Sequence, residues 1–159
     1  MRYFGVGLLA VMCLAVFSTA AVAQESYYIR QNGAKYQQYL SLGGTCDNNI
    51  RSLQASLNAQ RTAFNQGLAS RDRNVRSRAK RTFLSYLDRL MRAYQDSWNA
   101  YNQAIYWGER YAAGLLQLQS RAAQGRQVAA QVRGLKNTLR SLRTTEGQLQ
   151  QEARAASRR

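Results

Sequence analysis

The fold is decided by residues 75–118, VRSRAKRTFLSYLDRLMRAYQDSWNAYNQAIYWGERYAAGLLQL. When the stretch is drawn as an α-helix, its apolar residues stay within one sector of about 140°, with no break in phase. The residues on this apolar face are Val75, Ala79, Phe83, Tyr86, Leu87, Leu90, Tyr94, Trp98, Tyr101, Ile105, Gly108, Ala112 and Leu115. The pattern predicts one long amphipathic helix against which other helices pack. Within it, Gly108 and Ala112 predict a notch where a helix or a large side chain approaches closely.

A first helix is predicted on the N-terminal side. Ile50, Leu53, Leu57 and Phe64 recur at helical spacing, and we expect this helix to end at residues 67–70. The connection to the long helix carries Ser70 and Asp72, either of which can act as an N-cap.

Residues 24–44 are harder to interpret, because Gly33 interrupts their weak helical spacing. The paired glycines Gly43 and Gly44 are followed by Thr, Cys, Asp and Asn, a composition typical of a turn that leads into a helix N-cap. We therefore expect a loosely structured segment over 24–44 and a single helical domain over 45–156.

A third helix is predicted from its heptad pattern. The seam alternates by four and three residues through Val128, Val132, Leu135, Leu139, Leu142 and Leu149. Glu146 interrupts one core position, and residues 120–125 are either a turn or a continuation of the long helix. Residues 157–159 are expected to form a mobile basic tail.

Together these segments predict an all-α protein. The chain contains no proline, and no stretch alternates with the period of a strand. We expect an elongated helical hairpin or a three-helix coiled-coil bundle, with the first and third helices lying end to end along the middle one. An exposed heptad seam would also favour a homo-oligomer or a helical protein partner.

Residues 1–23 have the features of a signal peptide. Arg2 supplies the positive end, residues 6–17 form the apolar run, and Ala21 and Ala23 fit a cleavage site before Gln24. The alternative is an uncleaved membrane anchor, although the apolar run is short for that role. After cleavage no second apolar segment of that length follows. We expect a periplasmic or secreted protein without a transmembrane segment.

The chain is strongly basic, with 23 Lys and Arg against 8 Asp and Glu. Such charge attracts polyanions and acidic partners. The densest run of cations is Arg71, Arg73, Arg76, Arg78, Lys80 and Arg81. It is either a solvated face whose stems cover a thin core or a site for a polyanion or an acidic partner. Export argues against nucleic acid as that partner.

Two smaller features are further candidates for contacts. Tyr106, Trp107 and Tyr111 lie outside the main apolar face, so they form a second packing face or an exposed aromatic contact. Cys46 is the only cysteine left after cleavage, and it is either a half-buried thiol or the site of an intermolecular disulfide.

The composition argues against catalysis. The chain has no histidine, and a single thiol forms neither a catalytic Cys-His pair nor a zinc site. Asp47, Asp72 and Asp88 each lie four residues before an arginine, the spacing of surface ion pairs on helices. No metal-ligand spacing or phosphate-binding loop is present. We therefore expect neither an enzyme nor a bound cofactor.

These patterns indicate an exported, non-catalytic envelope scaffold or adaptor that uses helix–helix and basic-surface contacts. One alternative is a periplasmic holdase-type chaperone for acidic or unfolded clients. Others are a binder of anionic lipid or envelope polymer, and a helical component of a pilus or secretion machine.

Overall fold

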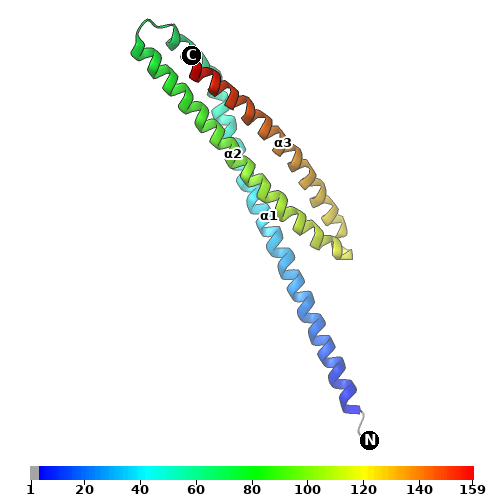
Figure 1. Ribbon diagram of the computed structural model, residues 1–159. Coiled ribbons are helices and arrows are strands. Elements are labelled where there is room, and N and C mark those ends of the chain that lie inside the picture. The colour runs from blue at the N-terminus through cyan, green and yellow to red at the C-terminus, as the bar shows by residue number, and fades with distance from the viewer. Residues whose placement is uncertain (1–3) are drawn as a thin grey trace.

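The protein is a long antiparallel three-helix bundle (Figure 1). The computed structural model describes the backbone of residues 4–159 and the side chains of residues 26–159. In chain order the elements are α1 (Phe4–Ala69), α2 (Arg73–Gln117), the short 3-10 helix η1 (Gln119–Arg121) and α3 (Ala122–Arg158). The predicted all-α class is confirmed, in its three-helix form.

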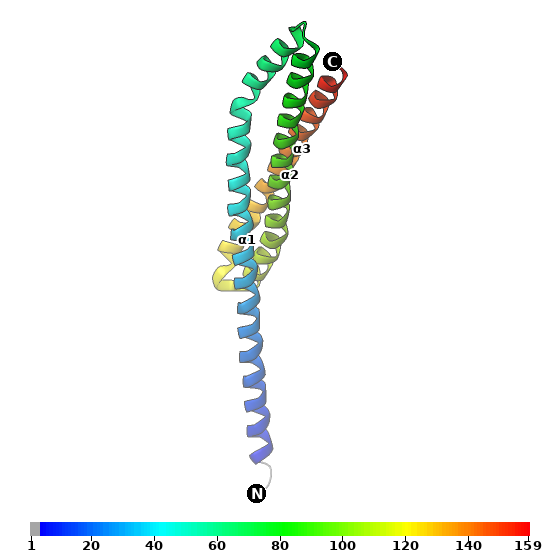
Figure 2. The same ribbon diagram turned by 90° about the vertical axis from the view of Figure 1, so that its left-hand side faces the viewer.

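Helix α2 is the central element, and both other helices pack against it. Figure 2 shows α1 and α3 lying along the same length of α2, so the end-to-end arrangement predicted for them is wrong. The two outer helices also contact each other through side chains. The Tyr36 hydroxyl donates to Gln131 Oε1 at 3.2 Å, and Arg61 pairs with Glu152.

The connections between the helices are tight. Asp72 is the N-cap of α2, and its Oδ1 accepts a hydrogen bond from the Asn74 amide at 2.7 Å. This confirms one of the two predicted caps. At the opposite end, α2 stops at Gln117 and η1 reverses the chain into α3. The open question over 120–125 is thereby resolved: the chain turns through η1 rather than continuing α2, and residues 122–125 are the first turn of α3.

The bundle has two ends, which are named here by their residues. The basic end comprises residues 61–83 and 152–159, where α1 meets α2 and α3 finishes. The exit end comprises residues 26–36 and 108–132, where α1 leaves the bundle and α2 turns into α3 (Figures 1 and 2).

Each half of the bundle has its own apolar cluster, which is named after the nearer end. The basic-end cluster is built on Ile50, Phe64, Phe83, Leu87, Leu90, Ala93, Tyr94, Leu149 and Ala156. The exit-end cluster is built on Ile29, Tyr36, Ala104, Ile105, Ala112, Leu115, Val128 and Val132. Most of the predicted apolar face of α2 is buried in these clusters, while Val75 is exposed.

The predictions for residues 24–44 and for the glycine turn are wrong. Helix α1 continues through Gly33, Gly43 and Gly44. Two of these glycines face α2: a methyl group on Gly33 would lie 2.9 Å from the Tyr111 ring, and one on Gly43 would lie 2.5 Å from the Tyr101 ring. Close packing of aromatic rings on the helix, rather than a turn, therefore accounts for these two glycines.

The tail prediction also needs correction, because α3 continues to Arg158. The ammonium group of Lys80 donates to the backbone carbonyl of Ser157, one of the carbonyls left without a helical partner at the end of α3. A cation at a helix C-terminus is also electrostatically favourable. Residues 157–158 are thus part of the packed helix.

The predicted signal peptide, residues 1–23, lies outside the described side chains, and its cleavage stays a prediction. Within residues 26–159, no helix has the length and apolarity that crossing a bilayer requires.

Candidate functional site

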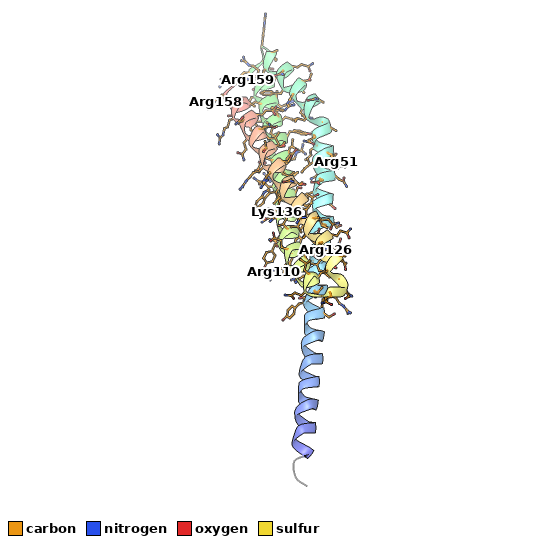
Figure 3. The ribbon with its side chains drawn as sticks, turned by 90° about the vertical axis from the view of Figure 1, so that its right-hand side faces the viewer. Arg51, Arg110, Arg126, Lys136, Arg158 and Arg159 are labelled. Atoms are coloured by element: carbon orange, nitrogen blue, oxygen red, sulfur yellow. The ribbon has the colours of Figure 1, made fainter. Side chains whose placement is uncertain are left out.

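The candidate site is the basic end of the bundle. The predicted run begins in the α1–α2 connection and continues over the first turns of α2; its five arginines are exposed and Lys80 is half-buried. The antiparallel packing adds cations that sequence reasoning did not assign to the site. These are Arg154, Arg158 and Arg159 at the end of α3. Figure 3 shows Arg158 and Arg159 at the same end of the molecule as the α1–α2 connection.

Carboxylates at the basic end are already engaged. Asp72 caps α2, as described above. Glu152 accepts two hydrogen bonds from Arg61, each of 2.7 Å, in a bidentate pair. The remaining guanidinium groups of this end therefore face solvent in an excess of positive charge, which favours an anionic partner.

The arginines also have a packing role. An open hollow of about 260 Å³ lies between α1 and α2, and it is lined by Arg78 together with Val75, Ala79, Phe64 and other residues. The Arg78 stem thus covers part of the apolar cluster while its charge stays at the surface. Arg78 therefore fits the interpretation in which arginine stems cover a thin core, and the binding of a polyanion or an acidic partner stays a prediction.

The aromatic candidates separate into packing and surface residues. Tyr106 is exposed, whereas Trp107 and Tyr111 are half-buried and pack against the exit-end cluster. Lys35 of α1 lies 4.0 Å from the Trp107 ring centroid, and Arg110 lies 4.4 Å from that of Tyr106. The predicted exposed patch is therefore limited to Tyr106, because the bundle uses the other two rings to join α1 to α2.

Between the two clusters lies a polar layer centred on Asp47. Its carboxylate accepts hydrogen bonds from Ser97 Oγ at 2.7 Å and from the Tyr101 hydroxyl at 2.6 Å. Burial, and then the neighbouring Asp47, raise the pKa of Tyr101. Asp47 thus joins α1 to α2 rather than forming the pair predicted from its spacing to Arg51. Of the three predicted surface ion pairs, the one between Asp88 and Arg92 is present, with Arg92 Nη2 lying 2.5 Å from Asp88 Oδ2.

Cys46 is a half-buried free thiol beside this layer. Burial, and to a smaller extent the charges of Asp96 and Asp47, raise its pKa. Because the thiolate is the species that attacks a disulfide, a raised pKa disfavours the reactive form. The intermolecular disulfide stays an untested prediction.

The predicted association seam of α3 is used within the chain. Val128, Val132 and Leu149 are buried. The other seam residues, Leu135, Leu139 and Leu142, are partly buried against the same clusters. Since α1 and α2 cover this seam, it no longer supports the expectation of an oligomer.

The notch predicted in α2 is present and filled. A methyl group on Gly108 would lie 2.6 Å from Val132 Cγ2 and 2.8 Å from the Tyr36 ring. Helices α1 and α3 thus both reach α2 at this level. The notch is a packing feature of the exit end.

The chemistry that the surface offers is that of guanidinium groups on a rigid frame. Among residues 26–159, no three His, Cys, Asp or Glu side chains come together as a metal site would require. Comparisons of the chain with protein-family models, with curated proteins and with solved structures find no match.

Proposed function

We propose that this protein is an exported, non-catalytic adaptor of the cell envelope whose basic end binds an anionic macromolecule, either an acidic protein or an anionic envelope polymer. The observation that carries the proposal is the convergence of cations from the α1–α2 connection, the start of α2 and the end of α3 at one end, where the nearby carboxylates are engaged. The proposed location is periplasmic or secreted, as the N-terminal segment predicts.

The rigidity of the helical bundle supports the choice of the basic end as the binding surface. Most of these cations project from α2 and α3, which pack on a shared apolar cluster, so the positions of their charges are partly fixed before a partner arrives. Arginine suits such a surface, because its planar guanidinium binds carboxylates and phosphates in a bidentate manner. Pre-positioned groups also lose less conformational freedom on binding than groups on a mobile tail.

The geometry favours this adaptor over the other hypotheses. The α3 seam is occupied within the bundle, which removes the main reason to expect a scaffold that assembles through helix–helix contacts. A holdase would require a broad exposed apolar surface. At the basic end, Val75 is the one large hydrophobic residue that is strongly exposed. Charge, rather than apolar contact, is therefore the recognition element that this end offers.

The test compares two sets of substitutions with the same charge change. Arg73→Gln, Arg76→Gln and Arg158→Gln remove three charges from the basic end. The control, Arg51→Gln, Arg133→Gln and Arg140→Gln, removes three exposed charges elsewhere. Soluble polyphosphate and poly-glutamate serve as the probes. The basic-end variant should bind about tenfold more weakly, and the control should change little.

Salt provides a second check. Binding of the parent protein should weaken as the salt is raised from about 0.05 M to about 0.5 M, because exposed charges are screened. Equal losses in the two triple variants, or binding of neither probe at low salt, would contradict the proposal.

A further inference from the structure

The exit end differs in chemistry from the basic end, because it combines cations with exposed apolar groups. Tyr27 and Tyr28, in the turn of α1 where it leaves the bundle, are 59% and 53% exposed. Leu116, beside the α2–α3 turn, is 46% exposed. Tyrosine rings are amphipathic and are enriched where protein meets the headgroup region of a membrane.

A hollow between two elements brings two arginines together at this end. It has a volume of about 270 Å³ and is lined by Ile29, Arg30, Gly33, Ala34, Gln37, Tyr111 and Arg121. Arg30 comes from α1 and Arg121 from the end of η1. This lining contains no carboxylate, so a phosphate group placed between the two guanidinium groups would meet two cations and no fixed anion.

The path of the chain places this end close to a membrane. Helix α1 projects beyond the bundle at the exit end (Figures 1 and 2). The apolar residues 6–17 lie on that projecting part of the chain, ten residues before Tyr27. During export such a segment occupies the bilayer, so the residues next to it in the chain, which form the exit end, stay near the membrane surface until cleavage. This step depends on the export that the proposed function includes.

We infer that the exit end docks on the surface of an anionic phospholipid bilayer. The hollow between Arg30 and Arg121 takes a lipid phosphate, while Tyr27, Tyr28 and Leu116 enter the headgroup region. Anionic lipids attract the cations, and burial of the three apolar side chains adds to the binding. The basic end would then point away from the membrane, about 60 Å distant along the bundle, where it is free to bind its own partner.

The processed chain that begins at Gln24 is the form to test. Both apolar clusters lie within residues 29–156, so removal of the first 23 residues takes nothing from them. Circular dichroism should show a helical protein before any binding measurement. Co-flotation is then measured with vesicles of phosphatidylglycerol and with vesicles of phosphatidylcholine.

Three double variants separate the contributions. Arg30→Gln with Arg121→Gln should lower partitioning onto phosphatidylglycerol vesicles about thirtyfold, since each basic residue near an anionic bilayer contributes on the order of fivefold. Tyr27→Ser with Tyr28→Ser should lower it about tenfold. The charge-matched control at the other end, Arg76→Gln with Arg158→Gln, should change it less than about threefold.

Orientation is tested with an environment-sensitive dye. In a Cys46→Ser background, the dye is attached at Tyr28→Cys or at Arg76→Cys. Its emission should shift to the blue on phosphatidylglycerol vesicles only at the exit end. Equal binding to both lipids, no binding to either, or an equal loss in the control variant would overturn the inference. The loss of polyphosphate binding in the variant with Arg73→Gln, Arg76→Gln and Arg158→Gln reports on the basic end. It is measured in parallel, so that the two proposals can fail independently.

Discussion

The two ends of the bundle pack their cores in different ways. At the basic end, large side chains meet each other: the Phe64 and Phe83 rings stack with centroids 4.6 Å apart and an interplanar angle of 16°. At the exit end, large side chains pack against glycine: Tyr36 lies on Gly108, and Ile29 on Gly114. The basic-end cluster therefore depends on side-chain volume, and the exit-end cluster on the absence of a Cβ. Outside the basic-end cluster, Gly67 also approaches α2 closely, at Ala79.

This difference determines which substitutions each end tolerates. A core that is filled by large residues loses stability when atoms are removed, since a cavity remains. A core in which rings pack against backbone loses stability when atoms are added. The polar layer at Asp47 lies between the two, so changes at one end should leave the packing of the other largely intact.

The largest effect is expected at the basic end. Phe83→Ala should lower the free energy of unfolding by about 3–5 kcal/mol, because it removes one ring of the stacked pair and leaves a cavity in the cluster. Urea denaturation followed by circular dichroism measures the change. Val75→Ala is the control on the same helix; its side chain is exposed, so the effect should stay within about 0.5 kcal/mol. A loss below about 1 kcal/mol for Phe83→Ala would contradict the proposed dependence on volume.

The corresponding change at the exit end adds a single methyl group. Gly108→Ala should destabilise the protein by about 1–3 kcal/mol, because the new carbon would lie 2.6 Å from Val132 Cγ2. Helix propensity alone predicts the opposite sign, a gain of about 1 kcal/mol. Gly134→Ala in α3, where no atom lies within 4 Å, is the control and should show that gain. If both variants were more stable than the parent protein, that result would contradict the close packing described at Gly108.

Alkaline pH should act on both apolar clusters and on the polar layer between them. Burial raises the pKa of Tyr36 and of Tyr94, and burial together with Asp47 raises that of Tyr101. A raised folded-state pKa means that the stabilisation is complete below the unfolded value of about 10 and is lost as the pH rises above it. The free energy of unfolding should therefore fall above about pH 10, by up to about 1.4 kcal/mol per pH unit for each such tyrosine.

The contribution of Tyr101 can be separated with a matched pair. Tyr101→Phe and Ser97→Ala each remove one hydrogen bond to Asp47, but only the first removes a titrating group. Urea denaturation between about pH 9 and pH 11 should give a shallower pH dependence for Tyr101→Phe. For Ser97→Ala it should give a parallel curve at lower stability. Equal slopes in the two variants would show that Tyr101 does not titrate in this way.

The sequence predicted helices best where the apolar period was long and unbroken. Residues 75–118 coincide closely with α2, and the heptad from Val128 lies within α3. The bounds of α1 were missed because glycine was interpreted by its local preference. Its actual role at Gly33 and Gly43 is set by rings more than 50 residues away in the chain, Tyr111 and Tyr101. That information is tertiary, and no local pattern contains it.

The candidate site was predicted only in part, because the sequence shows where charges are dense but not which distant segments pack together. The run from Arg71 to Arg81 is visible as a local density of charge. Its extension by Arg154, Arg158 and Arg159 requires the direction of α3 relative to α2. The paired arginines of the exit end, Arg30 and Arg121, are isolated in the sequence, and the hollow between them exists only after the helices pack.

The smallest predicted effect distinguishes the helix from the turn that the sequence predicts at Gly43 and Gly44. Gly44 lies within α1 with no atom near its missing Cβ, so Gly44→Ala should stabilise the protein by about 0.5–1 kcal/mol through helix propensity. Gly43→Ala, one residue away, would place a methyl group 2.5 Å from the Tyr101 ring and should destabilise it. A turn gives no reason for opposite signs at adjacent glycines. A helix with one face against α2 and another toward solvent requires stability changes of opposite sign. Thermal unfolding of the two variants is sufficient to measure the difference.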